Sequence, residues 1–533
     1  MNRTEVKRRQ ALAISGIIMI LTGILVSRLA GFRGITYISV AVFLYGMVDI
    51  LMNVGSVNAV TRLIRLRYTK GQYRNAEKMK KDVFLFQLLC SLFLSGVIFL
   101  AARPICTYVF RLPLSNLILA VLIPSAFIRT VTVTKIGIAR GEGMESLSVL
   151  TDVFRSIFIL IFSLLFCNVF IRYGTKVSGL LGEENFVAMY GGIGFSIAVL
   201  VSELLVLMFV FFLAAAGNRK RKNAADGMRT THSMGDNLKA YYSIRGILLF
   251  ICLMVFITFP LGLLFLCKAY PESEQILDSY GVFLSAYCGL GGIFILLVVI
   301  VMLPILGSCL GFLRKDELRY ARNAFQNGVH IGSVYAMFFS TFLTVESHRL
   351  GSVFFQEQSE LADKMLKTGS VIVLLIVLNV YFAEFLILTG KKAIVLGTVL
   401  LADIVQIVAL TILLNKSGAE ILSLVYAALL ANLLAAALLG FFTHRRLRIG
   451  MMWMQFLVIP LFVACIAGLL QFFIDRFFTP HLGENLALFL CFLISGILYL
   501  IGLLVLRNFR MQELEGVPGG KFIGALGQML HVL

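Results

Sequence analysis

The feature that most constrains this chain is a succession of long apolar runs separated by short polar breaks. A helical run of about 20 residues matches the hydrocarbon core of a bilayer, whereas membrane-spanning strands show about ten residues of alternating polarity. Of the 533 residues, 59% are hydrophobic and only 14% are charged. A backbone inside lipid must form its hydrogen bonds internally, and a helix does so within one segment. The sequence therefore predicts an all-α polytopic membrane protein.

The apolar runs define the expected spans. Fourteen transmembrane helices are predicted, which places both chain ends on one side of the membrane. They cover residues 11–31, 36–60, 83–102, 116–136, 150–171, 188–214, 244–268, 280–312, 324–345, 368–389, 393–414, 419–442, 453–475 and 485–506.

Lysine and arginine orient these helices. They concentrate in breaks on the N-terminal side, above all in the predicted loop 61–82 and in 218–239, which opens with Arg219-Lys220-Arg221-Lys222. Basic loops stay in the cytoplasm, so both termini are expected there, with anionic membrane lipids beside these loops. Because the net charge of +19 is explained in this way, no nucleic-acid partner is expected.

The second basic break also divides the chain. We expect an N-terminal six-helix bundle at 1–214 and a basic cytoplasmic linker at 215–243. A second six-helix bundle is expected at 244–450, and helices 13 and 14 with a cytoplasmic tail at 451–533.

Charged residues inside the predicted spans are the candidate site residues. A charge at membrane depth costs roughly 3 kcal/mol and usually faces a polar pathway or a partner. Two interpretations stay open: a cationic, water-accessible cavity, or structural ion pairs such as Arg28 with Asp49 and Asp152 with Arg155. Glu203, Glu384 and Asp403 are candidates for charge balance or for binding a coupling cation. The cavity candidates within spans are Arg28, Asp49, Arg129, Asp152, Arg155 and Arg245.

Motifs of several other function classes are absent from the sequence. It contains no GxxxxGK[ST] phosphate loop, no HExxH and no nucleophile elbow, and its nine cysteines show no metal-binding spacing. We therefore expect neither ATP-driven transport nor an enzyme, and no cofactor or metal.

Short motifs add a family resemblance. They are Ser-Arg-x-x-Gly-Phe at 27–32, Ala-Arg-Gly-Glu-Gly-Met at 139–144 followed by Arg155, and the closing segment 513–521. With the predicted 6+6+2 helix layout, the chain resembles the multidrug/oligosaccharidyl-lipid/polysaccharide (MOP) exporter superfamily. The nearest branch resembles the SpoVB-like polysaccharide biosynthesis proteins, which are related to the MurJ lipid II flippases.

This resemblance implies a V-shaped, MATE- or MurJ-like pair of bundles in the plasma membrane of a bacterium. It implies a flippase that moves a polyprenyl-diphosphate-linked glycan, such as a cell-wall precursor, to the outer leaflet by alternating access. By position, Arg28 and Arg33 would meet the diphosphate. Two alternatives remain: an ion-coupled multidrug antiporter of the same superfamily, and a non-transporting scaffold that recruits cell-envelope synthesis enzymes through its basic loops.

Overall fold

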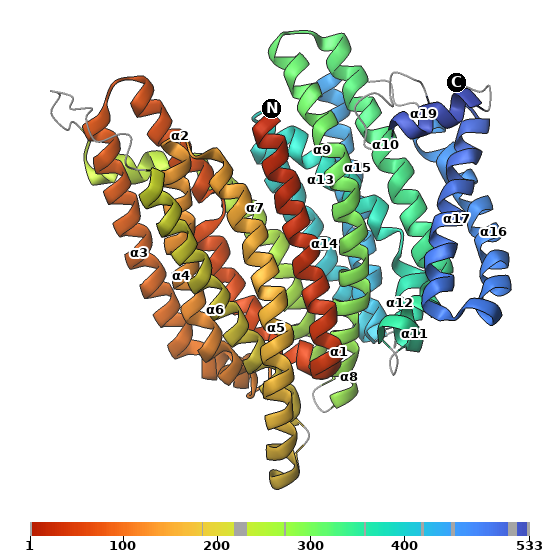
Figure 1. The fold of residues 1–533 in the computed structure, drawn as a ribbon, viewed down its shortest axis with the longest axis horizontal. Coiled ribbons are helices and arrows are strands. Elements are labelled where there is room, and N and C mark those ends of the chain that lie inside the picture. The colour runs from red at the N-terminus through yellow and green to blue at the C-terminus, as the bar shows by residue number, and fades with distance from the viewer. Residues whose placement is uncertain are drawn as a thin grey trace. The chain divides into compact units, whose positions relative to one another are not determined.

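A computed structural model describes residues 3–183, 185–217, 232–270, 273–355, 359–416, 420–448, 453–509 and 520–529. Within these ranges the regular structure is entirely helical (Figure 1). The basic run 219–222 and most of the closing segment 513–521 lie outside the described residues.

The helices follow one another with short connections. In chain order they are α1 (Arg3–Asn53), α2 (Ser56–Thr69), α3 (Tyr73–Pro104), α4 (Ser115–Gly141), α5 (Glu145–Leu181), α6 (Asn185–Gly217), α7 (Met234–Ala269), α8 (Glu274–Val282), α9 (Gly291–Arg314), α10 (Leu318–Val345), α11 (Ser347–Phe355), α12 (Ser359–Gly369), α13 (Ile372–Leu388), α14 (Lys392–Lys416), α15 (Leu422–Leu447), α16 (Ile459–Leu482), α17 (Glu484–Val505) and α19 (Gly520–Met529).

The predicted polytopic helical fold class is confirmed. Twelve stretches of the described chain are helical, long and apolar enough to cross a membrane, and α12 with α13, bent by 50°, makes a thirteenth if the two form one span. The predicted number, fourteen, is close. The difference arises where the predicted spans 11–31 and 36–60 join within a single apolar stretch, Glu5–Thr69.

A kink at Gly31, next to the predicted break at 32–35, divides α1 into two helical segments. Gly31 has φ 75° and ψ 168°, a backbone conformation that is essentially restricted to glycine. The second segment begins directly after it. The glycine of the 27–32 motif therefore separates the two segments of α1.

The basic stretch 61–82, expected to be a loop, is instead mostly helical, covering α2 and the start of α3. The physical reason is an apolar stripe: Val60, Leu63 and Ile64 recur at helical spacing and are buried. This stripe packs against α3 and α7 in one core cluster.

The described chain separates into two compact units. One comprises residues 21–281, and the other comprises residues 1–20 together with 282–533. These units follow the packing of the helices, whereas the domain ranges expected from the sequence followed the polar breaks; those ranges remain a prediction.

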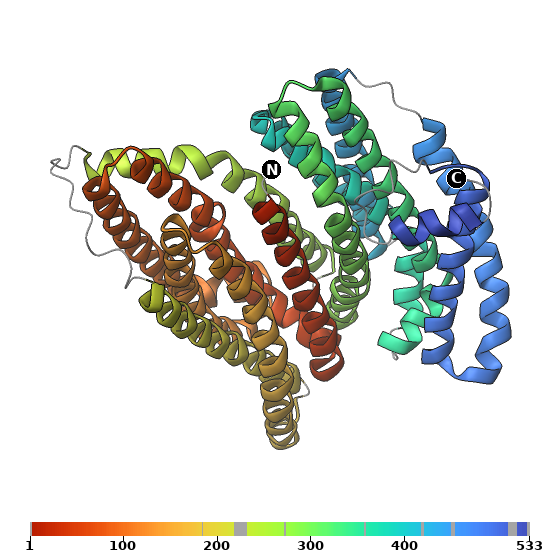
Figure 2. The same ribbon diagram turned by 45° about the horizontal axis from the view of Figure 1, so that its top comes forward.

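Each unit has its own close helix packing. In the first unit α5 and α6 lie side by side over most of their length and α4 packs on α6. In the second unit α10 packs against α9, α13 and α16. Figure 2 shows α16 and α17 as a hairpin, whose buried side chains share a core cluster with α10.

Candidate functional site

Two arginines on α1 have opposite environments. Arg28 is exposed, and in the described chain it forms no ion pair or hydrogen bond through its side chain. The neighbouring Ser27 is buried and donates a hydrogen bond to the carbonyl of Ile24 at 2.7 Å. The exposed guanidinium of Arg28 is therefore available to another molecule.

Arg33, five residues further, is held by partners from two helices. Its Nη1 donates to Glu274 Oε2 at 2.9 Å and to Asn185 Oδ1 at 3.0 Å, and its Nη2 donates to Asp278 Oδ2 at 3.0 Å. Glu274 and Asp278 belong to α8 and Asn185 to α6. Arg33 therefore joins α1 to two neighbouring helices, and its charge is balanced on site.

Arg129 and Asp152 meet between α4 and α5. Arg129 Nη2 lies 3.4 Å from Asp152 Oδ1, and both side chains are mostly buried. The expected alternative pair of Asp152 with Arg155 does not form, because Arg155 turns toward α6. Asp49, the proposed partner of Arg28, instead accepts a hydrogen bond from Asn53 at 2.8 Å on its own helix.

Arg155 forms an ion pair with Glu203, a side chain that is completely buried on α6. Arg155 Nη2 also donates to the hydroxyl of Tyr45 on α1 at 3.4 Å. An uncompensated charge at such a place would be strongly destabilising. The ion pair balances the charge of Glu203 against that of Arg155, while the role of Glu203 in transport stays a prediction.

Arg245 is 1% exposed and binds backbone. It donates to the carbonyls of Leu51 at 2.6 Å and Met52 at 2.9 Å, which belong to the last turn of α1. These carbonyls have no partner within the helix, and a guanidinium satisfies them well. This geometry is that of a helix-capping residue, so we leave Arg245 out of the candidate site.

Glu384 and Asp403, the acidic candidates on α13 and α14, differ in whether they have a basic partner. Glu384 on α13 pairs with Arg9 of α1, which also lies 3.5 Å from Glu5. Asp403 on α14 keeps a buried Oδ2 without a hydrogen-bond partner in the described structure. Asp403 therefore differs from Glu384 in having no cationic partner among the described residues.

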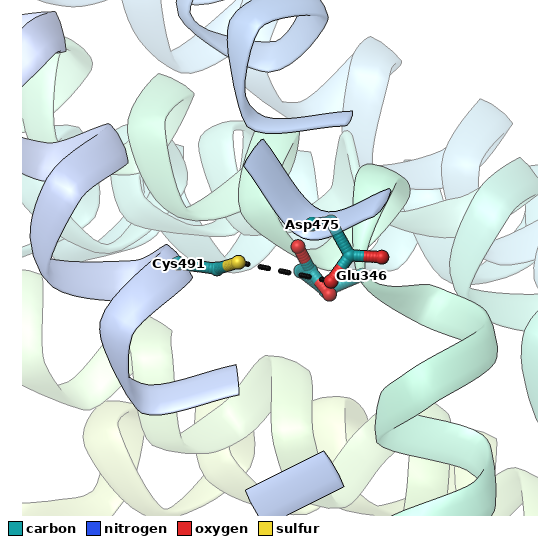
Figure 3. Close-up of side chains that lie close together, drawn as sticks. All are labelled: Glu346, Asp475 and Cys491. Atoms are coloured by element: carbon teal, nitrogen blue, oxygen red, sulfur yellow. Dashed lines mark hydrogen bonds between the residues drawn. The ribbon is translucent and has the colours of Figure 1, made fainter. Parts of the chain in front are cut away.

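Sequence reasoning missed a further cluster, which Figure 3 shows. Glu346, 2% exposed, follows α10; Asp475 lies on α16 and Cys491 on α17. Their potential ligand atoms all lie within 4.8 Å of one another. Glu346 and Asp475 escaped notice because each lies at the edge of a predicted span, where a charge is ordinary.

The surroundings of this cluster favour a hydrogen-bonded charge network over a metal site. Arg349 forms an ion pair with Asp475, which places a positive charge where a cation would bind. Gln471 donates to Glu346 at 2.9 Å, and Cys491 Sγ lies 3.7 Å from Asp475. Burial raises the pKa of Glu346 to about 7, so its carboxyl titrates near neutral pH.

Comparison with known proteins places the fold. A structure described as the inward-facing conformation of a multidrug resistance MATE family transporter of the MOP superfamily matches with a TM-score of 0.63 and 16% identity, covering 84% of this chain and 98% of that one. The chain has a MATE-like fold. An outward-facing MATE transporter of the MOP superfamily matches with a TM-score of 0.54 and 17% identity, over 84% of this chain and 98% of that chain.

A third neighbour with this MATE-like fold is a MOP superfamily transporter from Pyrococcus furiosus, described as having a binding pocket of reverse polarity that suggests a different function. It matches with a TM-score of 0.54 and 17% identity, over 84% of this chain and 98% of that chain. No protein-family model matches the sequence, and a search of curated proteins finds no match.

Proposed function

We propose that this chain is a membrane transporter that moves an anionic, lipid-linked cargo by alternating access, with a polyprenyl-diphosphate-linked glycan as the cargo class. The observation that carries the proposal is the exposed guanidinium of Arg28, on a membrane-spanning helix and without an acidic partner in the described chain. A guanidinium matches the fork of a diphosphate's oxygens.

The neutralisation of the neighbouring charges supports an anionic cargo. Asp152 and Glu203, the deep acidic groups of α5 and α6, are paired with arginines. Asp49 accepts a hydrogen bond from an amide, which leaves its negative charge in place. Among the basic cavity candidates in the described part of residues 21–281, Arg28 is the one without a carboxylate or backbone partner, and its charge attracts an anion.

The direction of transport follows from the membrane potential. With both termini in the cytoplasm of a bacterial cell, an inside-negative potential favours outward movement of two negative charges by roughly 4 to 5 kcal/mol per 100 mV. Export to the outer leaflet is therefore the favoured direction. Cell-envelope synthesis enzymes would supply the cargo and use it.

A second candidate function is an ion-coupled multidrug antiporter. The unpartnered Oδ2 of Asp403 favours it, since a proton or a metal cation would neutralise that buried oxygen. The structural neighbours described as multidrug resistance transporters favour it too. The Pyrococcus furiosus neighbour is described as having a pocket of reverse polarity that suggests a different function. This description supports using the charge of the pocket to distinguish a flippase from a multidrug antiporter.

The decisive experiment reconstitutes the protein in liposomes and follows two substrates, a fluorescent polyprenyl-diphosphate sugar and a cationic dye. Arg28→Gln should slow lipid-linked sugar movement by about tenfold or more, because a charge-assisted hydrogen bond is lost. Arg28→Lys should retain part of the rate. Arg172→Gln, which removes an exposed arginine of α5, is the matched control and should leave the rate unchanged.

The antiporter gives the opposite pattern. Dye movement would require a proton or sodium gradient, Asp403→Asn would abolish it, and Arg28→Gln would leave it unchanged. Sugar-lipid movement at the same rate in Arg28→Gln and in the wild type would overturn the flippase proposal.

A further inference from the structure

A cavity of about 360 Å³ lies between α2 and α4, away from the residues of the proposed transport site. Three arginines contribute to it, together with an amide and two hydroxyls. The polar lining consists of Asn58, Thr61, Arg62, Arg65, Thr69 and Arg140. Arg140 belongs to the 139–144 motif, for which the transport proposal supplies no role.

Small residues of α4 allow the close helix contact that forms one wall of this cavity. A Cβ added at Gly141 would lie 2.8 Å from Ile64 Cβ, and one at Gly137 would lie 3.1 Å from Val60 Cβ. Thr61 also donates a hydrogen bond to the carbonyl of Gly137 at 3.2 Å. These contacts hold α4 close to α2, and Arg140 of α4 lines the same cavity as Arg62 and Arg65 of α2.

The cavity carries an excess of positive charge. Arg65 Nη2 lies 2.7 Å from Glu145 Oε1 and 3.1 Å from the carbonyl of Arg140. Arg140 Nη1 donates to Asn58 at 3.0 Å, while Arg62 is exposed and has no side-chain partner in the described structure. The lining thus holds three guanidinium groups, of which Arg65 and Arg140 are held in place by hydrogen bonds.

The position of the cavity along the helices points to a lipid headgroup. Arg140 lies in the last turn of the spanning helix α4, and α2 ends the apolar stretch Glu5–Thr69. The ends of spanning helices lie at the depth of the headgroups, where basic residues meet anionic lipid. Leu66, which is 50% exposed, also lines the cavity and offers an apolar surface beside the arginines.

We propose that this cavity binds the phosphate of an anionic phospholipid headgroup, with Arg62 as the direct contact and Arg65 and Arg140 as flanking charges. Leu66 packs against the first carbons of the lipid. The site is distinct from Arg28, so a lipid bound here stabilises the protein and is not its cargo.

Native mass spectrometry of the full chain tests this proposal. The protein is released from nanodiscs of phosphatidylcholine mixed with phosphatidylglycerol, and the retained phosphatidylglycerol is measured. Arg62→Gln should lower the retention about tenfold, since one charge-assisted contact is removed. Arg62→Lys should restore part of it. The matched control, Lys81→Gln, removes an exposed charge from the same basic segment outside the cavity and should retain the lipid like the wild type.

Two results would overturn the proposal. One is equal retention of phosphatidylglycerol by Arg62→Gln and the wild type. The other concerns protein in discs of phosphatidylcholine alone, to which glycerol 3-phosphate is added. If this compound raises the Tm as much as phosphatidylglycerol does, the ligand is a soluble phosphate. Arg62 is exposed, so its substitution leaves the fold intact.

Discussion

Charged side chains inside this protein are neutralised by residues that are remote in sequence. Asp152 and Arg155 share one face of α5, which made them natural partners in the sequence. Each instead pairs with another helix, Asp152 with Arg129 of α4 and Arg155 with Glu203 of α6. The sequence predicts which charges lie at membrane depth, but a residue's partner depends on which helix packs beside its own.

Glu346 gives a residue-scale prediction on pH. Its pKa is raised from 4.5 to about 7, chiefly by burial, so folding favours the protonated carboxyl. This contribution to stability is complete below pH 4.5 and is lost as the pH rises through 7. We expect the free energy of unfolding to fall by up to about 3 kcal/mol across this range, measured as a decrease in Tm.

Glu346→Gln isolates this effect. The amide reproduces the neutral side chain, so the variant should match the wild type below pH 4.5, exceed its Tm at pH 8 and show a flatter pH profile. Asp363→Asn is the control, because it also removes a carboxylate but one that forms an ion pair with Lys367 at 2.7 Å. This variant should keep the fall in Tm between pH 4.5 and 7 that the wild type shows. An unchanged pH profile in Glu346→Gln would exclude Glu346 as the titrating group.

At the scale of the element, the kink of α1 sets the direction of its two halves. The sequence predicts a break close to the correct place, because polar and small residues cluster at 27–36. It does not predict which residue is non-helical. Only the positive φ of Gly31 shows that one residue takes the whole change of direction.

Gly31→Ala should therefore destabilise the protein by about 1 to 3 kcal/mol, because alanine is strained at this φ and ψ. No atom lies within 4 Å of the added Cβ, so the loss would be conformational and not a steric clash. Gly23→Ala is the matched control on the same helix: its Cβ also meets nothing within 4 Å and its φ is ordinary. It should be neutral or stabilising by about 0.5 to 1 kcal/mol. Equal Tm changes in the two variants would contradict the assignment of the kink to Gly31.

At the scale of the molecule, α1 belongs to both compact units. Its first residues, up to 20, group with 282–533, and the remainder groups with 21–281. Within the second unit Arg9 pairs with Glu384 of α13, and Gln10 donates to the carbonyl of Ile300 on α9 at 3.2 Å. The start of the chain thus contacts α9 and α13 through polar side chains.

Arg9 and Glu384 should show energetic coupling. We expect Arg9→Gln and Glu384→Gln to lower the Tm, and the double variant to lose less than the sum, with a coupling of about 1 kcal/mol for this partly buried pair. The exposed pair of Lys364 and Glu360, 3.8 Å apart, is the control and should show coupling near zero. Strictly additive losses at Arg9 and Glu384 would show that the pair does not hold the start of α1.

The sequence by itself determined that the chain is helical and crosses a membrane many times, because long apolar runs in lipid allow only structures whose backbone hydrogen bonds are internal. It also predicts which charges lie at membrane depth. The tertiary structure decided that 61–82 is helical, that α11 and α12 lie between two predicted spans, and that Arg28 stays without an acidic partner while Arg33 does not. The physical reason is distance in the chain, because ion pairs and buried faces form between helices that are remote in sequence. Local periodicity predicts each helix but does not predict which helices pack together.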